Sequence, residues 1–175
     1  MISWVKGRRS ARFAAALLVL TVVVTGCGRP PDEAWLRCTG FGAGDAATSV
    51  AVLEGKLDGT TLTSDVNFEN RSLIAGQTEG TGILVYRARI DYRMAGYSPP
   101  AAEYDVTLYL PPPAKGGTTT GTLTAFPLAS ASLKQWLINA GAGAPVAITA
   151  RVTFFAETDE GGKIETLGGI GIVLR

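Results

Sequence analysis

The stretch ILVYRARIDYRM, residues 83–94, decides how this chain of 175 residues folds. Apolar and polar side chains alternate along it with the period of two that is typical of a half-buried β-strand. The outward face is expected to carry Arg87, Arg89, Asp91 and Arg93. The inward face is expected to carry Leu84, Tyr86, Ala88, Ile90, Tyr92 and Met94. Because a slip of one residue exchanges the two faces, the pattern also predicts which side chains are buried.

The same alternation recurs along the chain. Between proline loops at 98–100 and 111–113, it places these residues on one face: Tyr104, Val106, Leu108 and Leu110. Near the C-terminus it turns inward Val146, Ile148, Ala150, Val152 and Phe154, and turns outward Thr149, Arg151 and Thr153. Weaker versions occupy 48–57, 60–69, 118–126 and 164–174. About seven strands with this spacing predict an all-β fold, an antiparallel β-sandwich of immunoglobulin-like or fibronectin III-like build.

The alternation makes specific predictions of burial. The side chains expected in the core are Tyr86, Ile90, Val106, Ile148, Val152 and Phe154. Those expected in solvent are Arg87, Arg89 and Arg151. Turn sequences separate the strands, namely Asp58-Gly59, Lys115-Gly116-Gly117 and Glu160-Gly161-Gly162.

One segment near 130–141 has helical spacing instead. Its apolar residues are Leu133, Trp136, Leu137 and Ala140, with serines available to cap its start and Gly141 to end it. We expect a short helix that covers an open end of the sandwich. A membrane contact through Trp136 is the alternative, although an amphipathic stripe more often faces a core.

The N-terminus combines three features in order. Lys6, Arg8, Arg9 and Arg12 form a basic start, and an apolar block follows at 13–24. A membrane-spanning helix needs about 20 apolar residues, so this shorter block predicts a signal peptide. The block ends in Val24-Thr25-Gly26-Cys27, which resembles the lipobox of bacterial lipoproteins.

This resemblance implies that Cys27 receives diacylglycerol and that cleavage falls between Gly26 and Cys27. The expected division is a signal peptide at 1–26, a lipidated N-terminus and tether at 27–36, and one β-sandwich domain at 37–175. Two or three acyl chains hold a protein at a membrane essentially permanently. Because Gly28 and not an acid follows the cysteine, the resemblance favours the outer membrane, facing the periplasm, in a Gram-negative cell. A free cysteine in a conventional signal, or an uncleaved signal anchor, are the alternatives.

Removal of residues 1–26 changes the overall charge. The mature chain would have 175 − 26 = 149 residues, enough for one domain with a sizeable core. Its 16 − 4 = 12 basic residues against 15 acidic residues give a net charge of −3. The basic residues form no cluster, so we expect no nucleic-acid partner.

Residues suited to catalysis are scarce. The chain has no histidine, the commonest general base and metal ligand. Cys38 cannot form a thiolate zinc site alone; it is expected either as a small buried residue or as an intermolecular disulfide partner. The glycine-rich stretch 40–44 lacks the strand and helix of a phosphate-binding loop and is expected to be a loop before the first full strand. We therefore expect neither a cofactor nor enzymatic activity.

Two acidic clusters are candidate sites. Glu157, Asp159 and Glu160 form an expected hairpin tip, where carboxylates could hold Ca²⁺, but their spacing does not match a calcium loop and favours a solvated turn. Glu103 and Asp105 lie on one face of a strand, with no positive partner nearby in sequence. Carboxylate pairs serve glycoside hydrolysis, yet such pairs usually come from opposite sides of a cleft.

The sequence therefore predicts a lipid-anchored lipoprotein of the bacterial envelope that acts as a non-catalytic binding or structural module. The first alternative is an accessory subunit docked on an envelope protein complex through an apolar patch or a sheet edge. The second alternative is a carboxylate-based hydrolase. The sequence does not fix the oligomeric state.

Overall fold

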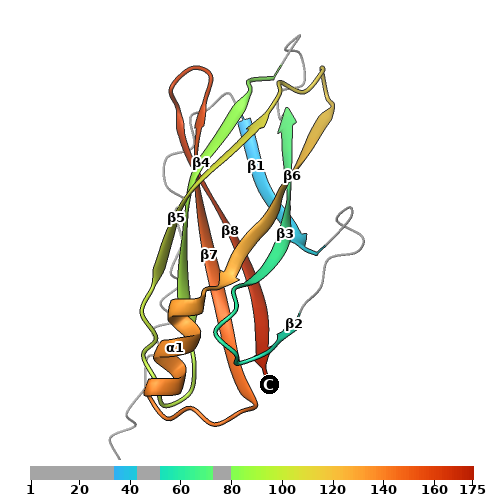
Figure 1. Ribbon diagram of the computed structural model, residues 1–175. Coiled ribbons are helices and arrows are strands. Elements are labelled where there is room, and N and C mark those ends of the chain that lie inside the picture. Colours follow the sequence, from blue (N-terminus) through green and yellow to red (C-terminus); the bar gives the residue numbers. More distant parts are fainter. Residues whose placement is uncertain (1–33, 43–51, 73–79) are drawn as a thin grey trace, which may run out of the picture.

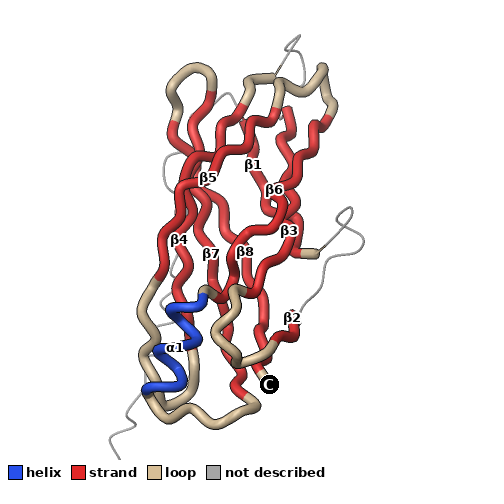
Figure 2. The backbone as a smooth tube through the Cα atoms, viewed as in Figure 1, coloured by secondary structure: helices blue, strands red, loops and turns tan. Residues whose placement is uncertain are grey.

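The computed structural model describes residues 34–42, 52–72 and 80–175, which form an all-β domain of two sheets with one short helix (Figure 1, Figure 2). The elements are β1 (Ala34–Phe41), β2 (Val52–Gly55), β3 (Leu62–Ser72), β4 (Ile83–Arg93), β5 (Ala102–Leu110), β6 (Thr118–Ala129), α1 (Ala131–Asn139), β7 (Val146–Thr158) and β8 (Lys163–Leu174). The all-β prediction is confirmed. The described residues contain eight strands instead of about seven, because β1 was not expected.

The prediction of a loop at 40–44 is wrong for its first two residues. Gly40 and Phe41 belong to β1, and the Phe41 side chain is buried. Gly42 follows the end of β1, and residues 43–44 lie outside the described residues. The glycines hid this strand from sequence reasoning because glycine is depleted in strands.

The strands form a three-stranded sheet in the order β1-β3-β6 and a five-stranded sheet in the order β2-β8-β7-β4-β5. Neighbouring strands are antiparallel except for β2 and β8, which pair in parallel. The long strands β7 and β4 lie inside the larger sheet. Strands β1, β6, β2 and β5 lie at the sheet edges.

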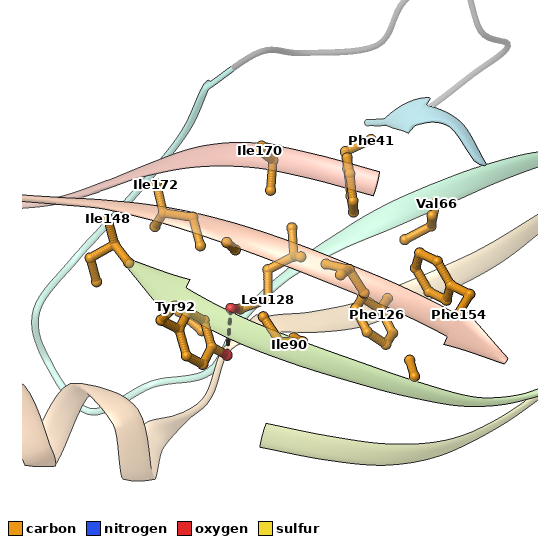
Figure 3. Close-up of a cluster of buried hydrophobic side chains, with 14 of the residues drawn as sticks. Phe41, Val66, Ile90, Tyr92, Phe126, Leu128, Ile148, Phe154, Ile170 and Ile172 are labelled. Atoms are coloured by element: carbon orange, nitrogen blue, oxygen red, sulfur yellow. Dashed lines mark hydrogen bonds between the residues drawn. The ribbon is translucent and has the colours of Figure 1, made fainter. Parts of the chain in front are cut away.

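The core lies between the sheets (Figure 3). The ring of Phe154 packs edge-on against Phe68, with centroids 4.8 Å apart, and lies 5.5 Å from the ring of Phe126. Tyr92 is buried and its hydroxyl donates a hydrogen bond of 3.0 Å to the carbonyl oxygen of Leu128. Burial raises the pKa of this hydroxyl, so Tyr92 remains a donor that links the two sheets.

Most of the predicted burial is confirmed. Ile90, Ile148, Val152 and Phe154 are buried, and Arg87, Arg89 and Arg151 are exposed. Two predictions were too strong, because Tyr86 and Val106 are only half-buried.

The first third of β4 reverses the predicted faces. Between Val85 and Arg87 the register shifts against both neighbouring strands: Tyr86 is an extra residue, a β-bulge, relative to β7, whereas β5 has two residues, 106 and 107, opposite Tyr86. A bulge adds one residue to a strand and so exchanges inward and outward positions across it. Ile83 and Val85 are therefore buried, while Leu84, which was expected to face inward, is 39% exposed.

The predicted helix is confirmed as α1. The Ser130 hydroxyl caps its start by accepting a hydrogen bond of 3.1 Å from the Leu133 N–H. Leu133 and Leu137 are buried, whereas Ala140 is exposed. In Figures 1 and 2 the helix lies at one end of the sheets, between the end of β6 and the start of β7. At nine residues, this helix of the described region is too short to cross a bilayer.

Candidate functional site

A ladder of charged residues crosses the outward face of β4 and β5. The register places Arg89 opposite Glu103 and Arg87 opposite Asp105. The Arg89 guanidinium lies 3.1 Å from Asp91 Oδ1 and 3.8 Å from Glu103 Oε1. Sequence reasoning missed Arg89 as the partner of Glu103 because Arg89 lies on the neighbouring strand, 14 positions away.

Asp105 differs from Glu103 in its surroundings. Arg87 places its guanidinium over the ring of Phe155, 4.5 Å from the centroid, in a cation–π contact. Within the described part of the chain, Asp105 has no ion pair shorter than 4.0 Å. Both predicted carboxylates are exposed and belong to one strand, so they do not oppose each other across a cleft.

The hairpin tip between β7 and β8 uses its central acid as a structural link. Asp159 Oδ2 accepts hydrogen bonds from the Gly82 N–H at 3.1 Å and from the Tyr109 hydroxyl at 3.0 Å. The hydrogen bond to this carboxylate raises the pKa of Tyr109. Glu157 and Glu160 are exposed. Among the described residues, no group of three or more Asp, Glu, Cys or His side chains is placed to hold a metal ion.

Cys38 is a free, half-buried thiol where β1 meets β8. Burial raises its pKa to about 11, so little reactive thiolate exists at neutral pH. Its backbone N–H donates to Thr166 Oγ1 at 3.2 Å, and the adjacent Gly168 leaves space for the sulfur. The position is that of a packing residue.

Two buried polar residues were not found from the sequence. Lys134 of α1 is 1% exposed, and its Nζ lies 3.7 Å from Asp58 Oδ1 in the turn before β3. Asn70 of β3 is buried, and its Nδ2 donates to the carbonyl oxygen of Thr81 at 2.9 Å. Lys134 is the only charged residue in 130–145, which was a usable signal. The sequence around Asn70 gave no such signal, since its neighbours in the strand, Glu69 and Arg71, are also polar.

The residues of the expected lipid site, Gly26 and Cys27, lie outside the described residues. Comparison with protein-family models and with curated proteins finds no match to this chain. Within the described residues, the polar groups therefore form a charged outer sheet face, a hairpin tip hydrogen-bonded through Asp159, and an ion pair between the buried Lys134 and the exposed Asp58.

Proposed function

We propose that this chain is a bacterial lipoprotein, anchored to the envelope by lipid on Cys27, whose β-domain is a non-catalytic binding or structural module. The observation that carries the proposal is the order of features at 6–27, a basic start and an apolar block that ends in Val24-Thr25-Gly26-Cys27. A dozen apolar residues suit a signal peptide better than a spanning helix. Two or more acyl chains on the cysteine would then replace the lost signal as the membrane attachment.

The strand order supports an immunoglobulin-like or fibronectin III-like sandwich. In such folds strands A, B and E share one sheet, and strands C, F and G share the other. Here β1, β3 and β6 correspond to A, B and E, and β4, β7 and β8 correspond to C, F and G. Strand β5 is then an extra strand beside β4, and β2 an extra strand beside β8. This architecture serves many unrelated functions, so it does not identify the ligand.

The surroundings of the polar residues favour a binding module over a hydrolase. Glu103 lies 3.8 Å from the Arg89 guanidinium, and Asp159 accepts hydrogen bonds from two donors. The thiol of Cys38 has a raised pKa, which makes it a poor nucleophile. All three groups thus have structural contacts within the domain, which favours a binding module over a hydrolase.

Substitution of the two cysteines tests the anchor. Cys27→Ser removes the sulfur that would carry the diacylglycerol, so we expect the chain to leave the membrane fraction or to accumulate uncleaved. Cys38→Ser is the matched control and should leave fractionation unchanged, since Cys38 lies inside the domain. A Cys27→Ser chain that is cleaved normally and still sediments with membranes would refute the lipid anchor.

A further inference from the structure

We propose that the free edge of β5 is a docking site for an extended strand of a partner protein, one that alternates basic and apolar side chains. This inference deepens the binding role proposed above and does not depend on the lipid at Cys27. It rests on the backbone, the burial and the charges of 102–110.

The backbone of β5 is available for pairing. Strand β5 is an edge of the five-stranded sheet and pairs with β4 alone. An edge strand presents unpaired N–H and C=O groups, which can accept a further strand. In the described part of the chain, no hydrogen bond joins 102–110 to any strand other than β4.

Strands β1, β2 and β6 carry features that hinder such pairing, whereas residues 163–170 of β8 pair only with β7 among the described residues. Strand β2 has only four residues, and β1 has a register shift between Cys38 and Gly40. Strand β6 contains Pro127, and Ala125 has a φ of 52°. Strand β5 runs for nine residues without proline, lysine or arginine, although its ladder with β4 has one register shift between Asp105 and Leu108. Of the features that protect natural edge strands from association, β5 therefore lacks proline and lysine.

The inward face of β5 is incompletely covered. Its side chains alternate between exposed and half-buried, and only Leu110 at the end is fully buried. The inward residues of β7, at the centre of the sheet, are fully buried along most of the strand. Tyr104, Val106 and Leu108 therefore still have apolar surface that an added strand could cover, as does Leu123 on the facing edge strand β6.

On the opposite side of the domain, contacts between β1 and β8 close the gap between the two sheets. There Cys38 of β1 donates its backbone N–H to Thr166 of β8, and Phe41 packs against Gly168. Strand β2 then pairs with the free side of β8 over residues 171–174. Along 102–110 no described strand has the position that β2 has on the other side.

The charges select the chemistry of the partner. Both charged residues of β5, Glu103 and Asp105, are acidic and exposed. Arg87, which faces Asp105 across the ladder, is directed onto Phe155 and leaves this carboxylate without an ion pair among the described residues. A Lys or Arg on an added strand would supply the missing opposite charge. A second copy of β5 would bring four carboxylates and no cation to the joint, so charge disfavours a homodimer.

The test uses the full chain in detergent and a short acetylated peptide that alternates valine with lysine. We expect the peptide to shift the backbone amide resonances of 102–110 and to slow their hydrogen exchange. A peptide with N-methylated valines, which cannot complete the ladder, should not bind. Binding of the lysine peptide should weaken about fivefold or more in Asp105→Lys, and that variant should prefer a peptide that alternates valine with glutamate.

Glu165→Lys is the matched control, since Glu165 is exposed on the same sheet face but lies on β8, which β7 and β4 separate from β5. It should leave affinity for the lysine peptide nearly unchanged. If Asp105→Lys and Glu165→Lys lowered the affinity for the lysine peptide equally, the effect would come from the overall charge of the domain, and the proposal would be overturned. Unshifted amides at 102–110, or a dimer in which these amides are protected without peptide, would overturn it as well.

Discussion

Gly168 and Gly169 are neighbours in β8 that face opposite sides of the five-stranded sheet. A Cβ at Gly168 would lie 2.9 Å from Cys38 Sγ and 3.0 Å from Cζ of the buried Phe41. A Cβ at Gly169 would meet only the carbonyl oxygen of Ala150, at 4.0 Å. The contact between β1 and β8 thus depends on the missing side chain at one of two adjacent glycines.

We therefore predict opposite effects of the two alanine substitutions. Gly168→Ala should lower the free energy of unfolding by about 1–3 kcal/mol, because it overpacks the seam between the sheets. Gly169→Ala should be neutral or should stabilise by about 0.4–1 kcal/mol, because it restricts the unfolded chain without a clash. Thermal unfolding of both variants followed by circular dichroism measures the difference. Equal melting temperatures would mean that the β1–β8 contact is looser than described.

The raised pKa of Cys38 predicts a dependence of stability on pH. The thiol titrates near 9.0 when exposed and near 11 in the folded domain. Between these values the unfolded chain loses a proton that the folded chain keeps, so the stability contributed by Cys38 falls as pH rises from about 9 to about 11. The stability difference between the native chain and Cys38→Ala should shift by about 2 kcal/mol over this range. A constant difference would contradict the burial of the thiol.

At the scale of elements, alternation predicted where strands lie more reliably than where they bulge. In β7 the period of two holds through 146–154, and every predicted face is correct. In β4 the bulge at Tyr86 reverses the first residues, although the local sequence continues to alternate in a plausible way. A bulge is decided by pairing with both neighbouring strands, which one strand's sequence does not encode. The edge position of β5, and hence the half-burial of Val106, is likewise a property of the sheet.

Helix α1 is joined to the turn before β3 by Lys134 and Asp58. A buried ammonium is costly without its partner, while an apolar residue of similar size avoids that cost. We expect Lys134→Met to change the free energy of unfolding by less than about 1 kcal/mol, or to raise it. Asp58→Asn should lower the melting temperature in the native chain, yet keep the oxygen that accepts from Thr60.

The two substitutions should interact. In the Lys134→Met background, Asp58→Asn should have a smaller effect, because no ammonium is left without a partner. A double-mutant cycle of melting temperatures measures this coupling. Additive effects would show that the ion pair does not hold α1 in place.

At the scale of the molecule, the number of residues between Cys27 and Ala34 limits which end of the domain a lipid on Cys27 could hold near a membrane. Ala34 pairs with Ser72 at one end of β3, and Ala129, just before α1, pairs with Leu62 at the other. These ends are about 34 Å apart along the strand. The tether spans 34 − 27 = 7 residues, or about 23 Å when extended. A lipid on Cys27 would therefore hold the Ala34 end near the bilayer. The tether is too short for the domain to stand with α1 on the bilayer and the Ala34 end away from it. This argues against the membrane contact considered for Trp136.

Energy transfer to a membrane dye tests this orientation. In a Cys38→Ser background, a fluorophore at Glu160→Cys marks the hairpin at the Ala34 end, and one at Asn139→Cys marks α1. We expect transfer from the hairpin to be the more efficient. Equal or reversed efficiencies would contradict the orientation.

The lipid on Cys27 is the central claim, and the mass of the N-terminal peptide from the membrane-extracted chain tests it most directly. The account predicts a peptide that begins at Cys27 and carries a diacylglyceryl group on the sulfur. A peptide that begins at any other residue, or an unmodified Cys27, would contradict it.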